Sequence, residues 1–250
     1  MAVTLRKTGA PLFVATALLI GLWSLPAGAQ ELTLSFGEDG SLATRSVQLL
    51  VLLTVISLAP AIAIMVTCFP FIVTVLAILR QAIGLQQSPP NMLMVSLALF
   101  LTYFVMEPVF TEAWTAGIAP LMEGRIDIDE AFVQTMAPLR DFMTARVSAD
   151  TLGEMAALRP DLDPRVSALD APLSVLVPSF LLSEMQHAFQ VGFLIFLPFL
   201  IIDLVVAAVL MSMGMMMVPP AIVSLPFKLA FFVVADGWAL IAASLVRGYS

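Results

Sequence analysis

Four long apolar runs dominate the sequence, and short polar segments separate them. The first run, residues 46–79, holds no charged side chain over 34 positions, and the others cover residues 92–110, 178–211 and 220–246. About 20 apolar residues suffice for a helix to cross the hydrocarbon core of a membrane. The pattern therefore predicts an all-α membrane protein, in which the first run forms one span and an extension.

Turn-forming residues join these runs in pairs. Glycine, glutamine, serine and proline separate the first two runs, which predicts a first helical hairpin over residues 46–110 and a second over residues 178–250. Proline removes a backbone donor and tends to kink or end a helix. We therefore expect kinks at Pro60 and Pro70 in the first run and a break at Pro198 in the third.

The segment between the two hairpins, residues 111–177, has a different character. Residues 111–170 hold eleven acidic residues against five arginines, so this part carries a net charge of −6. Apolar residues recur there at helical spacing, as at Phe132, Met136 and Leu139. We expect a small acidic extracytoplasmic segment of two or three short amphipathic helices.

The N-terminus resembles a segment that is removed after export. Residues 1–29 combine two positive residues, a charge-free apolar stretch and an Ala-Gly-Ala sequence before a cut at Gln30, which is the build of a signal peptide. Cleavage leaves residues 30–45 as an extracytoplasmic N-terminal segment; the alternative is an uncleaved first helix. Four spans after a signal peptide place the acidic segment outside and Arg80 inside, as the positive-inside rule favours.

Composition supports the membrane assignment and excludes several other classes. Apolar residues make up 60% of the chain and charged residues 12%, and the mean hydropathy is +1.02. A net charge of −7 argues against a nucleic-acid partner. One cysteine and one histidine exclude disulfide frameworks and metal sites rich in these residues. No catalytic motif is recognisable, so we expect neither an enzyme nor a bound cofactor.

Two ionisable residues interrupt the second hairpin. Asp203 lies about 13 residues before the centre of the 212–220 loop, and Lys228 lies about 12 after it, so an antiparallel hairpin places them at similar depth. A charge within the membrane needs a partner or a wet cavity. We favour a structural Asp203–Lys228 ion pair; a proton relay and pairing with other chains remain the alternatives.

Other polar residues have simpler interpretations. Asp236 precedes Trp238 near the end of the last run, as an interfacial aspartate beside an aromatic anchor would. Glu184 and His187 form a polar pair at the expected start of the third helix. Cys68, within an apolar run, is interpreted as a small buried hydrophobic residue.

Methionine is concentrated in one place. Five of the seven positions 211–217 are methionine, whereas the whole chain has 15 in 250 residues. Methionine is unbranched and polarizable, and it can repack around varied shapes. A methionine run around Gly214 therefore indicates a soft, deformable seal that faces a passage; the alternative is a lipid-facing or buried turn.

Several unusual strings resemble one known family. They are Ile78-Leu79-Arg80-Gln81-Ala82-Ile83-Gly84, Gln86-Gln87-Ser88-Pro89-Pro90-Asn91, Leu97-Ala98-Leu99-Phe100-Leu101-Thr102, Ala188-Phe189-Gln190-Val191-Gly192-Phe193, Leu197-Pro198-Phe199-Leu200-Ile201-Ile202-Asp203-Leu204-Val205-Val206, Met211-Ser212-Met213-Gly214-Met215-Met216-Met217-Val218-Pro219-Pro220 and Ser224-Leu225-Pro226-Phe227-Lys228. Over residues 45–250 the chain is similar to the FliP/SctR family of type III secretion export-apparatus proteins.

The resemblance implies a fold, partners and a function. It implies bent helical hairpins that assemble into a ring or cone, as a pentamer with two smaller export-gate membrane proteins. Unfolded flagellar subunits would pass through this channel in the bacterial inner membrane, at the flagellar basal body and in contact with membrane lipid. Met215, Met216 and Met217 would form the pore gasket, and Gly214, Pro219 and Pro220 the hinge of its loop. The alternatives are an injectisome export gate and a small-solute or ion transporter that uses Asp203.

The chain departs from the family pattern at two places. Cys68-Phe69-Pro70-Phe71 stands where the family usually has Ser-Phe-Thr-Arg, so a basic residue is lost and a proline is gained. Glu107 stands where a small residue often precedes Pro108.

Overall fold

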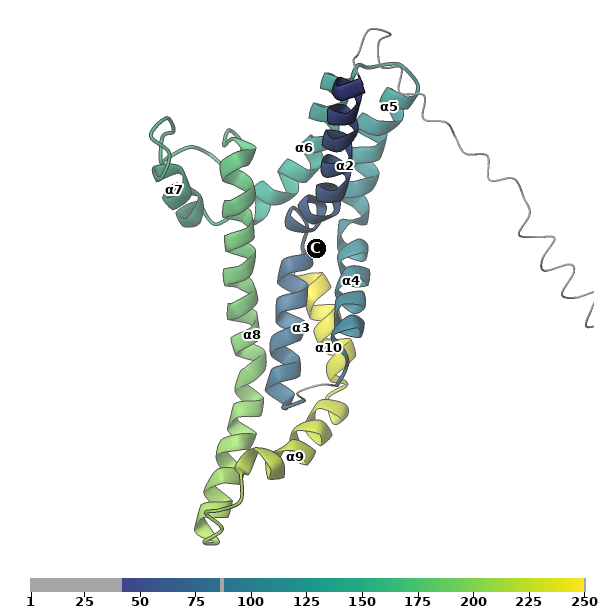
Figure 1. Cartoon of the computed structure of the whole chain (residues 1–250). Helices are drawn as coiled ribbons and strands as arrows, with labels where there is room; N and C mark the ends of the chain where they lie inside the picture. The colour runs from purple at the N-terminus through teal and green to yellow at the C-terminus, as the bar shows by residue number, and fades with distance from the viewer. Residues whose placement is uncertain (1–41, 86–87, 250) are drawn as a thin grey trace, which may run out of the picture. The chain divides into compact units, whose positions relative to one another are not determined.

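The computed structural model of the chain describes residues 42–85 and 88–249, and no strand occurs among them. The chain divides into two units, residues 1–53 and 54–250, and helix α2 (Leu42–Met65) runs across the boundary. Figure 1 shows the helices of the second unit, which carries nearly all of the described side chains. The predicted signal peptide, residues 1–29, lies outside the described residues.

The first apolar run forms two helices. The helical structure is interrupted after α2 by the non-helical residues 66–68, and α3 (Phe69–Ile83) follows. Helix α2 continues through Pro60 as far as Met65. Pro70 lies in the first turn of α3, where proline leaves no donor missing. Gly84 ends α3 at φ 90°, the left-handed conformation that glycine adopts at little cost.

The second run forms a helix longer than expected. Helix α4 (Asn91–Ala113) continues through the π-helical turn η1 (Trp114–Ile118) into α5 (Ala119–Met122), giving 32 helical residues instead of an end near residue 110. At Gly117 in η1 an added Cβ would lie 2.8 Å from the carbonyl oxygen of Ala131. Glycine thus permits the close approach of this helix to α6.

The acidic segment contains the short helices that its pattern predicts. They are α6 (Ile128–Arg146) and α7 (Ala149–Ala157), and residues 158–172 contain no helix. The Asp127 carboxylate caps α6 by accepting a hydrogen bond of 2.9 Å from the backbone N–H of Glu130. Helix formation in this segment therefore rests on local capping as well as on packing.

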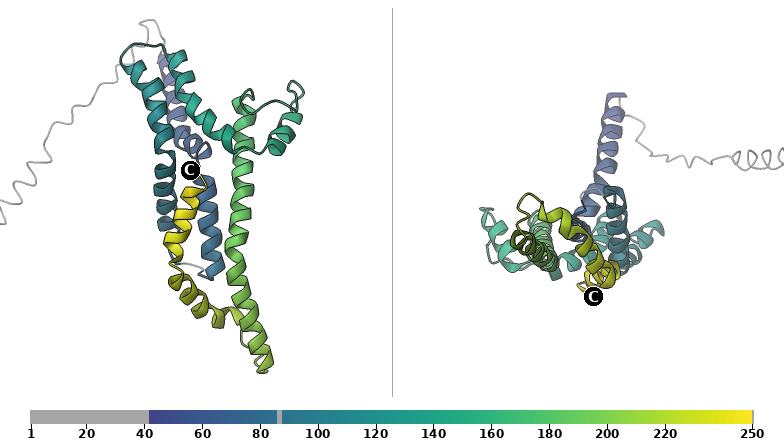
Figure 2. Two further views of the ribbon diagram at one scale, coloured as in Figure 1. Left: turned by 180° about the vertical axis from the view of Figure 1, so that it is seen from behind. Right: turned by 90° about the horizontal axis from the view of Figure 1, so that it is seen from below.

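The third run forms a single helix, α8 (Leu173–Ser212), of 40 residues. The expected break at Pro198 is wrong, since α8 continues through both of its prolines. Buried α8 residues, including Gly192 and Phe199, lie on both sides of Pro198. Helix α3 packs along α8, as Figures 1 and 2 show, and an alanine Cβ at Gly192 would lie 2.4 Å from Ile78 Cδ1.

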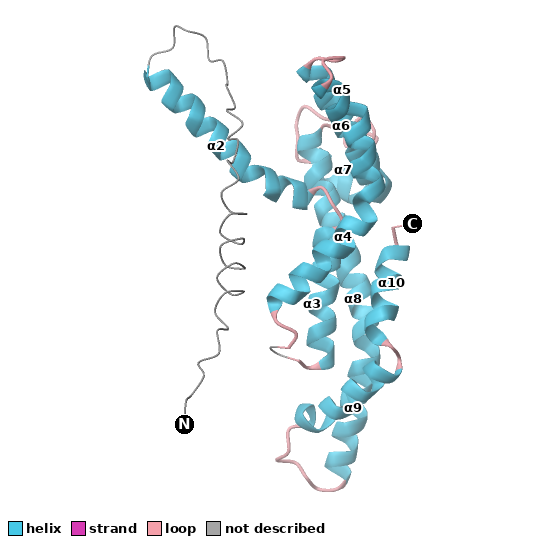
Figure 3. Ribbon diagram, turned by 90° about the vertical axis from the view of Figure 1, so that its right-hand side faces the viewer, coloured by secondary structure: helices cyan, strands magenta, loops and turns pink. Residues whose placement is uncertain are grey.

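The fourth run is bent, which the hydropathy pattern did not predict. Helices α9 (Pro220–Val234) and α10 (Gly237–Arg247) meet at 62°, and Figure 3 shows the change of direction. Asp236 occupies the corner at φ 49°, ψ 48°, and the ring of Phe232 lies where a side chain at Gly237 would be, 2.2 Å from an added Cβ. By length and composition, three described helices can cross a membrane, or four if this bent pair counts as one span.

Candidate functional site

The methionine-rich turn lies between α8 and α9, at the end of α8 far from α7 (Figure 1). All of residues 211–220 are exposed. Met216 and Met217 are the extreme cases, at 83% and 97% of their accessible surface. Burial of apolar surface stabilises a protein by about 25 cal/mol per Å². Contact with another apolar surface would therefore lower the free energy of these exposed methionine side chains.

Glycine fixes the first side of this turn. Gly214 has φ 77°, its N–H donates to the carbonyl of Met211 at 3.0 Å, and the N–H of Met215 donates to the carbonyl of Leu210 at 3.0 Å. This pair of bonds is the Schellman arrangement that ends a helix with a left-handed glycine. The loop geometry at Gly214 therefore follows from the local sequence.

Two prolines fix the second side. Pro219 is the N-cap of α9 with φ −64°, and Pro220 is the first residue of the helix. The proline ring holds φ near −65°. The residues predicted to shape the loop therefore lie on both sides of the turn. Gly214 ends α8, Pro219 and Pro220 restrict the backbone at the start of α9, and the exposed Met216 and Met217 lie between them.

An apolar cavity of about 550 Å³ opens between α8 and α9 next to the turn. Met213 and Met215 line it together with apolar side chains of both helices, among them Val206 and Phe227. The methionine-rich turn thus faces two environments: its tip is exposed, and its flanking thioethers border the hollow between the helices.

The structure brings Asp203 and Lys228 together. The Lys228 ammonium lies 2.6 Å from Asp203 Oδ2, and it also donates to the backbone carbonyl of Ala82 at 3.0 Å. The Ser224 hydroxyl donates to Asp203 Oδ1 at 2.5 Å. The sequence did not point to Ser224 or to Ala82, although Ser224 precedes Lys228 by one helical turn.

The Asp203–Lys228 ion pair is largely buried, so the loss of either partner would destabilise the fold. The Lys228 side chain is 7% exposed and the Asp203 side chain 32%. A buried charge is tolerated where it is paired and its hydrogen bonds are made. Because its members come from α8, α9 and the end of α3, this Asp203 cluster (Asp203, Ser224, Lys228 and the Ala82 carbonyl) fastens three helices beside the methionine-rich turn.

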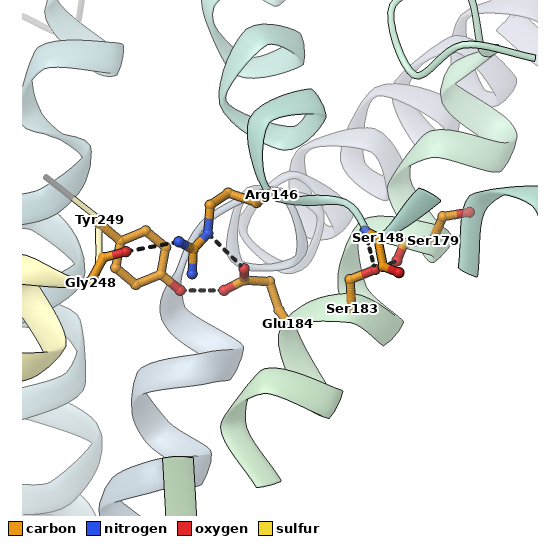
Figure 4. Close-up of polar contacts among 7 residues, drawn as sticks. All are labelled: Arg146, Ser148, Ser179, Ser183, Glu184, Gly248 and Tyr249. Atoms are coloured by element: carbon orange, nitrogen blue, oxygen red, sulfur yellow. Dashed lines mark hydrogen bonds and ion pairs between the residues drawn. The ribbon is translucent and has the colours of Figure 1, made fainter. Parts of the chain in front are cut away.

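A second polar cluster lies at the opposite end of α9–α10, and Figure 4 shows its members. Arg146 Nε lies 3.2 Å from Glu184 Oε1, and Arg146 Nη1 donates to the Gly248 carbonyl at 2.8 Å. The Tyr249 hydroxyl donates to Glu184 Oε2, and the Arg146 guanidinium lies 4.1 Å from the centroid of the Tyr249 ring. We call Arg146, Glu184, Gly248 and Tyr249 the Glu184 cluster.

The predicted Glu184–His187 pair is corrected by this arrangement. Glu184 lies well inside α8, fully buried and bound to Arg146 and Tyr249, whereas His187 is exposed. Burial raises the pKa of Tyr249, and the nearby Glu184 carboxylate raises it further. The phenol therefore stays protonated and serves as the donor.

The remaining polar residues are placed as follows. Cys68 is fully buried, as predicted. Phe71, at the position where the family pattern has arginine, is buried with its ring edge-on to Tyr249 at 5.5 Å between centroids. Asp236 is exposed at the corner between α9 and α10. Within the described parts of the chain, no group of three His, Cys, Asp or Glu side chains could hold a metal ion.

Comparison of the sequence with those of known proteins points to one family. The sequence profile of the FliP family matches residues 52–245. The chain is 49% identical to the flagellar biosynthetic protein FliP of Caulobacter vibrioides, over 97% of this chain and 91% of that protein. It is 46% identical to the proteins of that name from Bacillus subtilis, over 85% and 96% of the two chains, and Rhizobium meliloti, over 89% and 93%.

Proposed function

The chain belongs to the FliP family, and on that premise we propose that it is a channel-forming core subunit of the flagellar type III protein export gate. Its apolar helices fit a multi-pass protein of the bacterial inner membrane. In this proposal several copies surround a passage, at the flagellar basal body, through which unfolded flagellar subunits cross the membrane. The relatives' names favour a flagellar system over an injectisome.

One observation carries the proposal: the exposed methionine-rich turn between two fixed helix ends. Copies of the turn repeated around a ring would bring Met215, Met216 and Met217 together across the passage. Unbranched thioether side chains adapt to irregular and changing shapes. Such a collar can close on itself at rest and deform around an extended polypeptide.

The rest of the chain has surfaces that suit assembly. Large apolar side chains are exposed along α8 and α9, including Leu204, Val205 and Val233. Helix surfaces of this kind contact either lipid or other protein in a membrane protein. We propose that neighbouring copies cover part of this surface, in a pentamer that also binds two smaller export-gate membrane proteins.

The test replaces Met215, Met216 and Met217 together by alanine in the full-length chain, expressed with its export partners. We expect the assembled gate to leak small ions at rest, measured as ion flux in liposomes that hold the purified complex. A matched triple variant changes the three exposed methionines Met92, Met122 and Met185 to alanine.

The control should assemble and remain closed. An alanine variant of the turn that assembles normally and stays as tight as the wild type would show that these side chains do not form the closure. A leak of equal size in the control would show that general loosening, and not the turn, opens the complex.

A further inference from the structure

Helices α9 and α10 form a bent arm that starts at the methionine-rich turn and ends at the C-terminus. The Asp203 cluster fastens α9 through Lys228. The Glu184 cluster fastens the far end of α10 through Gly248 and Tyr249. Between these two attachments the arm turns by 62° at Asp236, next to Gly237.

Along its length α10 is packed loosely. A cavity of about 280 Å³ separates it from α8, lined by Leu194 and Ile195 on one side and Leu240 and Ile241 on the other. Of the α10 side chains, only Ile241 and Leu245 are buried. The position of α10 therefore depends strongly on what holds its end.

Tyr249 makes the attachment at that end. Its ring packs edge-on against Phe71 of α3 at 5.5 Å and stacks on Phe142 of α6 at 6.0 Å between centroids. Arg146 covers the ring, and the hydroxyl reaches Glu184 of α8. One side chain thus joins the end of α10 to α3, α6 and α8.

The Glu184 cluster can open without leaving an unpaired charge. If α10 moves away, Glu184 loses the Tyr249 hydroxyl but keeps the Arg146 guanidinium on its other oxygen. The costly event for a buried carboxylate is the loss of its charge partner, and undocking avoids it. Asp236 supplies a pivot, because a single residue in the left-handed region connects two otherwise regular helices.

We propose that Tyr249 is a C-terminal latch, and that α10 docks and undocks about Asp236 as a unit, in equilibrium between a fastened and a released state. The released state leaves α3, α6 and α8 in place and separates α10 from the acidic segment. This inference does not depend on the proposed export function.

Hydrogen–deuterium exchange of the full-length chain in nanodiscs tests the latch. In Tyr249→Ala, which removes the ring and the hydroxyl, we expect exchange of the 237–247 amides to rise at least about tenfold, while exchange in α3 and α8 is unchanged. Tyr249→Phe keeps the ring and loses only the hydroxyl, so it should give a smaller rise in the same peptide. Tyr103→Ala, at the other tyrosine of the chain and exposed on α4, is the matched control.

Unchanged exchange of α10 in Tyr249→Ala would overturn the proposal. A rise of equal size in α3 and α8 would also overturn it, because Tyr249 would then stabilise the whole fold and not one docked helix. If Tyr249→Ala fails to fold, Tyr249→Phe decides, and a spin-label distance between positions 247 and 150 gives a second readout. Release should add a longer distance in Tyr249→Phe, whereas an unchanged single distance counts against the latch.

Discussion

Replacing Lys228 by methionine should test whether the Asp203 cluster holds the second hairpin together. Methionine keeps the length and apolar stem of lysine but leaves Asp203 with only the Ser224 hydroxyl. Removal of one partner of a buried ion pair costs about 3–5 kcal/mol of folding free energy. Because the Asp203 side chain is 32% exposed, water can solvate part of the carboxylate charge that Lys228 no longer neutralises. We therefore expect about 3 kcal/mol, the lower end of that range.

The free energy of unfolding can be measured by SDS titration of the purified chain in mixed micelles. Arg247→Met is the control for the loss of one cation, because Arg247 is exposed at the end of α10. The free energy of unfolding of this control should stay within about 0.5 kcal/mol of the wild-type value. The double variant Asp203→Asn, Lys228→Met removes both charges and should recover most of the lost stability, within about 1 kcal/mol of the wild type.

The charge-swapped variant Asp203→Lys, Lys228→Asp adds a sharper expectation. The Ala82 carbonyl now accepts from the ammonium of Lys228, so after the swap a carboxylate faces a carbonyl oxygen. The swap should recover only part of the loss that either single change causes. If Lys228→Met is as stable as the wild type, or if the double-variant cycle shows no coupling between the two positions, the ion pair is not what fastens these helices.

Three further changes test the close contacts and the corner. Gly192→Ala should destabilise by about 1–3 kcal/mol through overpacking against Ile78 Cδ1, and adding Ile78→Val should recover part of this, measured by the same titration. Gly117→Ala meets backbone atoms of α6, so it should increase hydrogen exchange in α6, and unchanged exchange would show that η1 can shift freely. Asp236→Val should lower the free energy of unfolding by about 1–2 kcal/mol, because a β-branched residue is strained in the left-handed backbone region. Asp236→Gly should not lower it. Equal melting temperatures of the two variants would contradict this explanation.

Hydropathy located the helices better than it located their ends. Pro198 suggested a break that does not occur, although a proline inside a helix costs about 3 kcal/mol or more. Conversely, the Asp236-Gly237 pair is a turn signal that the surrounding apolar residues masked. At these positions the tendency of proline or Asp-Gly to interrupt a helix disagreed with the continuous apolar pattern of the segment. The sequence alone does not say which of the two effects is larger.

The two polar clusters differ in how far the sequence could reveal them. Asp203 and Lys228 stand almost symmetrically about one turn, so counting residues along an antiparallel pair is enough to suggest that they meet. Glu184 has partners 38 and 65 positions away in the chain, on α6 and after α10. Their meeting depends on the packing of several helices and on the bend at Asp236, for which a single sequence carries no counting rule.

The Asp203 cluster has a second consequence, which concerns the register of α9 on α8. Both helices present apolar side chains along most of their length, and such surfaces pack in lipid with little preference for one register. A buried charge pair fits only one register, although an apolar pair of similar size can be equally stable.

We therefore expect the variant Asp203→Leu, Lys228→Leu to match or exceed the wild type in unfolding free energy and yet to lose a unique structure. Spin labels at the exposed positions 204 and 230 should give one narrow distance in the wild type and a broad or split distribution in this variant. A narrow distribution in both proteins would mean that apolar packing alone sets the register, and that the ion pair serves another purpose.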